Sequence, residues 1–168
     1  MYKICKTTAS IERQKQFELT LIHMMETQSF ENITVTALCN KMNVPRKAFY
    51  RYFDSMEDVL DAFLHEIIAG AYIHLDVYPE LDKFFQYWKD QKYILDVLEK
   101  NGLSQSLINN FLSFILTDTE VNHLTNKKIK FIGHINAILT VMILWHHSGM
   151  KQSTSEMKAL VTDMLNLN

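Results

Sequence analysis

The sequence predicts an all-α protein, and three observations support this fold class. Glycine and proline together make up only six of the 168 residues, and 48% of the residues are hydrophobic. Apolar side chains also recur at helical spacing through most of the chain. This composition argues against a disordered chain and against a loop-rich β-protein.

The first helices are short and follow each other closely. Apolar spacing predicts a helix over residues 11–27, and Thr34 is placed to cap a short second helix. Asn43 suits the left-handed conformation that ends a helix. Pro45 suits a helix start, so a third helix is predicted over residues 45–53 after a tight turn.

The rest of the chain is predicted to form one long helix and five further ones. A capping box at Ser55 begins the long helix, which continues to about Leu75, and Pro79 marks the next break. No Gly/Ser-rich linker separates the parts, and we expect two domains, residues 8–55 and 56–168. The later helices are expected at residues 80–88, 91–100, 104–116, 127–147 and 155–167.

Positive charge gathers at the start of the chain. The net charge is −2, but residues 1–56 hold eight Lys and Arg against five Asp and Glu, which suits a protein with one end that approaches a polyanion. Two short helices joined by a tight turn, the second basic on its exposed side, are typical of a module that enters the major groove of DNA. An ordinary helical hairpin with packed aromatic side chains is the alternative.

Residues 33–60, ITVTALCNKMNVPRKAFYRYFDSMEDVL, closely resemble the DNA-binding motif of the TetR family of bacterial regulators. The resemblance implies a helix-turn-helix DNA-binding domain followed by a helical ligand-binding and dimerisation domain. Phe49 and Phe53 would be core residues. The residues that the resemblance implies in contact with double-stranded DNA are Thr34, Val35, Thr36, Arg46, Lys47, Ala48, Tyr50 and Tyr52.

Four positions depart from the family pattern. Asn43 replaces the turn glycine, Pro45 a serine or threonine, Lys47 a small residue, and Met56 a lysine that contacts phosphate. Loss of that lysine is expected to weaken DNA binding, and Lys47 would restore a charge nearby. The C-terminal residues that resemble a subgroup including regulators of dihydroxyacetone kinase operons are Gly133, Trp145, Gly149 and Ser155, Glu156 and Met157.

The last two predicted helices favour a homodimer. The helix at residues 155–167 has one apolar stripe, whereas apolar side chains cover much of the helix at residues 127–147. The short last helix cannot bury all of this apolar surface by itself. Symmetric pairing with a second copy would bury the remainder, as the resemblance also implies, and two recognition helices then require a palindromic operator. A monomer with a central core helix is the alternative.

The middle of the chain is rich in aromatic residues. A regulator of this kind would bind a small apolar or aromatic ligand there, although core packing explains the same residues. We therefore expect a dimeric, ligand-responsive transcriptional regulator. The alternative is a TetR-like coregulator that acts through another protein without reading an operator. The aromatic residues of this region are Phe84, Phe85, Tyr87, Trp88, Tyr93, Phe111 and Phe114.

Motifs for catalysis, cofactors or metals are missing from the sequence. It has no glycine-rich phosphate loop and no nucleophile elbow, so we expect no enzyme, no catalytic residues and no cofactor. His134, His146 and His147 lack the spacing of zinc ligands, so no metal is expected. The apolar run at residues 137–145 is too short to span a membrane, and no secretory signal is present, so we expect a cytoplasmic protein.

Overall fold

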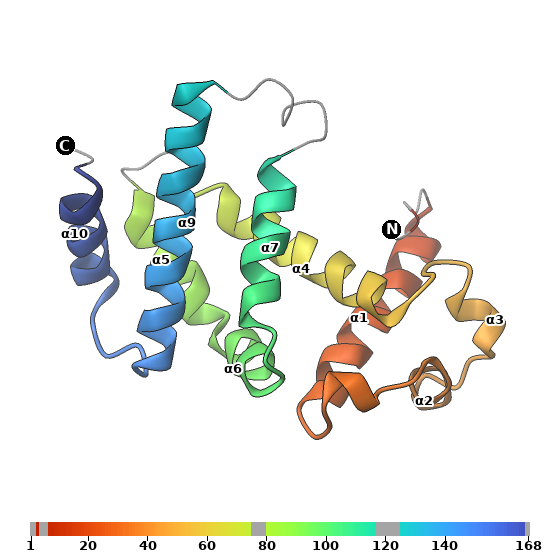
Figure 1. Cartoon of the computed structure of the whole chain (residues 1–168). Helices are drawn as coiled ribbons and strands as arrows, with labels where there is room; N and C mark the ends of the chain where they lie inside the picture. The colour runs from red at the N-terminus through yellow and green to blue at the C-terminus, as the bar shows by residue number, and fades with distance from the viewer. Residues whose placement is uncertain (1–2, 4–6, 75–79, 117–124, 167–168) are drawn as a thin grey trace. The chain divides into compact units, whose positions relative to one another are not determined.

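The computed structural model describes residue 3 and residues 7–74, 80–116 and 125–166, which form helices joined by turns (Figure 1). This confirms the predicted all-α fold. The expected helix end at Leu75 and the break at Pro79 lie outside the described residues. The elements are α1 (Thr8–Met25), the 3₁₀ turn η1 (Phe30–Asn32), α2 (Val35–Lys41), α3 (Arg46–Phe49), α4 (Met56–Tyr72), α5 (Leu81–Asp90), α6 (Lys92–Lys100), α7 (Ser104–Ile115), α9 (Asn126–His147) and α10 (Thr154–Leu165).

The chain divides into two compact units, residues 1–66 and 67–168. The first unit is built around Phe17 of α1, which is fully buried. The centroid of its ring lies 5.7 Å from that of Phe49 and 6.0 Å from those of Tyr52 and Phe53. Phe49 and Phe53 are fully buried. These contacts hold α1 against the segment that contains α3.

α3 is shorter than the predicted helix over residues 45–53. Pro45 is its N-cap rather than its first residue, and regular helix ends at Phe49. Beyond it, the N–H groups of Tyr52 and Phe53 both donate to the Phe49 carbonyl, at 2.9 and 3.1 Å. Tyr52 and Phe53 are both buried, and adjacent side chains of a straight helix point about 100° apart. After Phe49 the backbone therefore continues as turns rather than as regular helix, and both rings are buried there.

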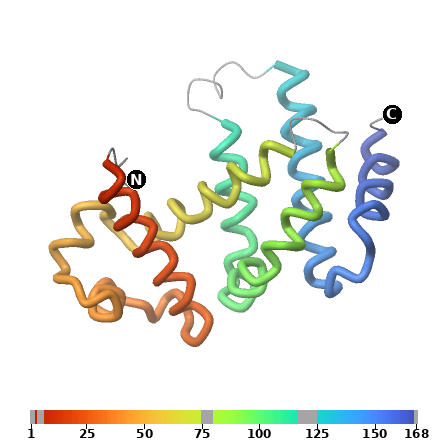
Figure 2. The backbone as a smooth tube through the Cα atoms, turned by 180° about the vertical axis from the view of Figure 1, so that it is seen from behind, coloured from red at the N-terminus to blue at the C-terminus, as the bar shows by residue number. Residues whose placement is uncertain are grey.

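The second unit packs α5, α6, α7, α9 and α10 against one another (Figure 2). Aromatic and aliphatic side chains form its core. Phe84, Phe85, Trp88 and Phe111 are fully buried, and the Phe85 ring meets Trp145 of α9 edge-on at 5.6 Å. α10 lies beside α5 and α9. The predicted bounds of these five helices agree with the structure to within two residues at each described end.

The end of α4 fits closely against α5 within the second unit. The Tyr87 hydroxyl donates a hydrogen bond of 2.8 Å to the Ile67 carbonyl. A Cβ atom at Gly70 would lie 2.6 Å from that hydroxyl oxygen. A side chain at position 70 would therefore require the end of the Tyr87 side chain to shift.

α9 is the longest described helix, with 22 residues, and its most apolar window has a mean hydropathy of 1.4. By length and composition alone such a helix could cross a membrane, and 33% of that window is buried. Core helices of globular proteins meet the same criterion. Ile135, Ile138, Leu139 and Met142 of α9 are fully buried, so we interpret α9 as a core helix with one uncovered side.

One carboxyl group is buried in the first unit. Glu18 of α1 is 4% exposed. Burial raises the pKa of its carboxyl from 4.5 to about 7, and the charge of Glu66 adds to this effect against smaller opposing contributions from Gln14 and Lys15. Lys15 is itself ion-paired with Glu66. Glu18 therefore holds its proton in the folded state at pH values where the unfolded chain has lost it.

We predict that Glu18→Gln raises the stability of the protein at pH 8 and changes it little at pH 5. A raised carboxyl pKa means that stability falls as pH rises from 4.5 to about 7, because the folded state binds the extra proton. At pH 8 the variant should gain on the order of 1 to 3 kcal/mol in free energy of unfolding. Urea denaturation at one protein concentration measures this, with the exposed Glu12→Gln as the control. An equal difference between variant and unmodified chain at both pH values would contradict it.

Candidate nucleic-acid interface

The start of α2 is formed as the sequence predicts. The Thr34 hydroxyl accepts a hydrogen bond of 3.1 Å from the Ala37 N–H and caps the helix. A hydroxyl that accepts this bond can still donate its own proton. Thr34 and Thr36 are exposed and Val35 is half-buried. This end of α2 therefore presents two hydroxyl groups that can reach phosphate oxygens.

A tight turn joins α2 to α3. Asn43 has a φ angle of +52°, in the left-handed region where the family pattern has glycine. The Val44 N–H donates 3.0 Å to the Cys39 carbonyl, and the Asn43 N–H donates 3.1 Å to the Asn40 carbonyl. The first of these is the six-to-one bond of a Schellman motif. Asparagine thus closes α2 in place of glycine because it tolerates this conformation better than most residues.

α3 presents its cationic side chains to solvent. Arg46, Lys47 and Tyr50 are exposed and Ala48 is half-buried, whereas Phe49 is fully buried. The Arg46 Nη2 atom donates 3.1 Å to the Tyr50 hydroxyl, and the guanidinium carbon lies 6.0 Å from the centroid of the Tyr50 ring. The two side chains therefore form one cationic and aromatic pair on the exposed side of α3.

Tyr52 lies differently from the other residues predicted to contact DNA. Its side chain is only 9% exposed, and its ring packs against Phe17. That Tyr52 contacts DNA stays a prediction. Its burial leaves little of the side chain accessible to DNA. Met56, which replaces the lysine of the family pattern, is the first residue of α4 and is half-buried.

Lys3 contacts this site, and sequence reasoning missed it. Its backbone N–H donates to the Tyr52 carbonyl, and its ammonium group donates to the Tyr50 carbonyl. Lys3 lies in a polar stretch almost fifty residues before Tyr50, and no local sequence pattern indicates that the two residues are in contact. Only the folding of the first unit brings it to the end of α3.

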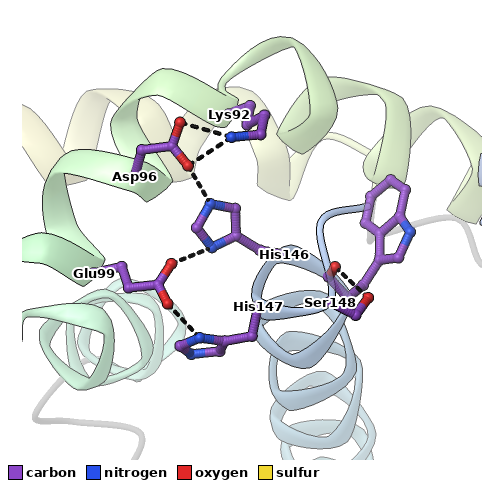
Figure 3. A network of polar contacts seen from close by, with 7 residues as sticks. Lys92, Asp96, Glu99, His146, His147 and Ser148 are labelled. Atoms are coloured by element: carbon purple, nitrogen blue, oxygen red, sulfur yellow. Dashed lines mark hydrogen bonds and ion pairs between the residues drawn. The ribbon is translucent and has the colours of Figure 1, made fainter. Parts of the chain in front are cut away.

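The histidines near the end of α9 lie in a network of polar contacts with α6 (Figure 3). His146 is buried, with Nε2 2.8 Å from Asp96 and Nδ1 3.1 Å from Glu99, and His147 Nδ1 lies 2.5 Å from Glu99. Burial raises the pKa of Asp96, but hydrogen bonds from Lys92 and His146 outweigh this effect and lower that pKa below its usual value. Within the described ranges, no group of three or more His, Cys, Asp or Glu side chains is arranged to hold a metal ion. The network ties α9 to α6.

Residues 22–63, from the later part of α1 into α4, match the model of the bacterial regulatory proteins of the tetR family. The match covers the capped α2, the turn and the cationic α3 described above. The first unit therefore contains a segment that is similar to the DNA-binding domain of the tetR family of bacterial regulatory proteins.

The solved structures that share the fold include two named regulators. One is a TetR-family transcriptional regulator from Streptomyces coelicolor, with a TM-score of 0.52 and 14% identity over 89% of this chain and 79% of that one. The other is the dihydroxyacetone kinase operon activator DhaS, with a TM-score of 0.54 and 16% identity over 92% of this chain and 94% of that one. Identities this low show a common fold alone. No curated protein sequence matches the chain.

Proposed function

We propose that this chain is a homodimeric cytoplasmic transcriptional regulator whose first unit binds a palindromic operator in double-stranded DNA. The observation that carries the proposal is the exposed cationic side of α3 above a fully buried Phe49. The excess of Lys and Arg in residues 1–56 suits the electrostatics of the phosphate backbone. We assign DNA contacts to Thr34, Val35, Thr36, Arg46, Lys47, Ala48 and Tyr50, with Tyr52 as the least accessible member, and we assign no catalytic role.

Substitutions on α3 test DNA recognition directly. Binding is measured by mobility shift on the upstream region of the chain's own gene and on duplexes selected from a random library. Arg46→Ala or Lys47→Ala should each cost on the order of 1 to 3 kcal/mol of specific binding if the side chain contacts a base. Tyr50→Phe should weaken binding to all sequences similarly, because a phosphate contact carries no sequence information.

Lys89→Ala on α5 is the control, since it removes one exposed lysine of the second unit. Unchanged affinity in the Arg46 and Lys47 double variant would contradict the proposed role of α3. If the unmodified chain shifts no duplex at all, the alternative function applies, a coregulator that acts through another protein without reading an operator.

The homodimer is supported by an apolar surface on α9 and α10. On α9, Ile129 is 54% exposed and Leu144 is 61% exposed, and on α10 Leu160 and Met164 are 53% and 45% exposed. The first of these helices also exposes Gly133 and Thr140, and small side chains allow close approach of a second helix. Exposed apolar area of this kind marks an interaction site, and two-fold pairing of α9 and α10 with those of a second copy would cover it.

We predict that Leu160→Glu or Leu144→Glu converts the protein into folded monomers that lose operator binding. A charge buried in a dimer interface without a partner is strongly unfavourable, whereas either position tolerates a charge in the exposed monomer. Sedimentation at micromolar concentration measures the mass. Leu19→Glu on α1, where the leucine is 52% exposed, is the matched control. Ile138 is unsuitable because it is fully buried within the protomer. A monomeric unmodified protein that still binds its operator would contradict the dimer.

We also propose that the second unit responds to a small, largely apolar or aromatic ligand. The supporting observation is Trp88, whose fully buried indole Nε1 has no hydrogen-bond partner among the described residues. A buried donor without an acceptor is costly, and a ligand with an acceptor group would satisfy it. Tyr87, its neighbour, bonds the Ile67 carbonyl of α4, so rearrangement around Trp88 would reach α4. Two described pockets lie elsewhere, beside Lys158 of α10 and at the turn before Pro45.

A ligand that raises the melting temperature should also change the fluorescence of Trp88. The Trp145→Phe variant leaves Trp88 as the single tryptophan, so its emission reports on this region alone. A compound library is screened by thermal shift, and each compound that stabilises the protein is tested for Trp88 emission and for release of DNA. A ligand that releases DNA without altering Trp88 emission would contradict binding at this place.

A further inference from the structure

The segment after α3 contains carbonyl groups that regular helix does not use. α3 ends at Phe49 and α4 begins at Met56. The carbonyl groups of Tyr50 and Tyr52 therefore lie beyond the last helical turn, where backbone acceptors need partners from elsewhere.

Lys3 supplies both partners. Its backbone N–H donates 3.0 Å to the Tyr52 carbonyl, and its ammonium group donates 2.7 Å to the Tyr50 carbonyl. The same ammonium lies 3.5 Å from the Asp54 carboxylate. A cation is also favourable at the C-terminal end of a helical turn, where carbonyl groups carry partial negative charge. Lys3 thus contacts three residues of the segment after α3, namely Tyr50, Tyr52 and Asp54.

Tyr50, whose backbone carbonyl is bound by Lys3, is also the residue whose hydroxyl binds Arg46. The Tyr50 backbone is held by the Lys3 ammonium, while the Tyr50 hydroxyl accepts the 3.1 Å hydrogen bond from Arg46 Nη2. A shift of the Tyr50 backbone would move its ring and hydroxyl, and the guanidinium group would lose its partner. Lys3 and Arg46 are therefore coupled through the backbone and side chain of a single tyrosine.

We propose that Lys3 is a positioning residue for DNA recognition, which holds Tyr50 in place and through it orients Arg46, without contacting DNA itself. This inference rests on the proposed function, because it assigns a role in DNA binding. The contacts of the Lys3 ammonium with the Tyr50 carbonyl and the Asp54 carboxylate favour positioning over phosphate binding. A phosphate would have to share or replace these contacts, and Asp54 would repel it.

Substitution of Lys3 separates positioning from direct contact. Lys3→Met removes the ammonium group, and Lys3→Arg keeps a cationic donor. We expect Lys3→Met to weaken binding to a selected duplex about tenfold, equivalent to about 1.4 kcal/mol, and Lys3→Arg to recover most of the affinity. The slope of log affinity against log salt concentration should stay unchanged in Lys3→Met because no phosphate contact is lost. Lys89→Met on α5 is the matched control for the loss of one exposed positive charge.

A double variant tests the coupling. In an Arg46→Ala background, Lys3→Met should have little further effect on affinity, because residues that act through one contact are not additive. Amide hydrogen exchange of residues 50–54, measured without DNA, should be faster in Lys3→Met and restored in Lys3→Arg. Loss of a surface charge alone would not speed this exchange, because removing a nearby cation disfavours approach of the hydroxide catalyst.

Three results would overturn the inference. The first is equal affinity of Lys3→Met and the unmodified chain for the duplex. The second is a salt slope that is smaller by about 0.9 in Lys3→Met, which indicates a lost phosphate contact. The third is full additivity of the effects of Lys3→Met and Arg46→Ala on the free energy of binding. If the unmodified chain binds no duplex, the proposed function itself fails. If it binds and Lys3→Met binds equally well, the proposed function stands and this inference alone fails.

Discussion

The burial of Phe17 is the constraint on which the first unit depends. Its ring contacts the rings of Phe49, Tyr52 and Phe53, so one residue of α1 fixes the segment at and after α3. Protein interiors are packed as densely as organic crystals, and these contacts leave α3 little freedom to rotate about its own axis. The exposed position of Arg46 and Lys47 follows from the burial of the aromatic side. Tyr50 and Lys3 then refine the orientation that this packing sets.

In the second unit, α9 carries apolar side chains on both its buried side and its exposed side. Ile138 and Met142 are fully buried against the rest of the unit, whereas Leu144 is 61% exposed. The polar contacts of His146 and His147 with α6 lie at the C-terminal end of the same helix. α9 is thus fixed by polar contacts at one end and by core packing along one side. Its other side is exposed, with Ile129 and Leu144 more than half accessible.

The parts of the candidate site that could be predicted are those made by residues close together in sequence. The Thr34 cap bonds a residue three positions away, and the turn at Asn43 is closed by α2 itself. Such local hydrogen bonds leave a compositional signal, because few residue types can make them. The contacts of Lys3 join residues 47 positions or more apart, and no pattern in the sequence marks them.

The sequence by itself determined the all-α class, the order and approximate bounds of the helices, and the TetR-type motif at residues 33–60. These depend on periodicity, capping and turn residues, which act over a few positions. Only the tertiary structure decided where α3 ends, that Tyr52 is buried, and which apolar residues of α9 remain exposed. Periodicity shows which side chains share one face of a helix, but the packing of distant segments decides what covers that face.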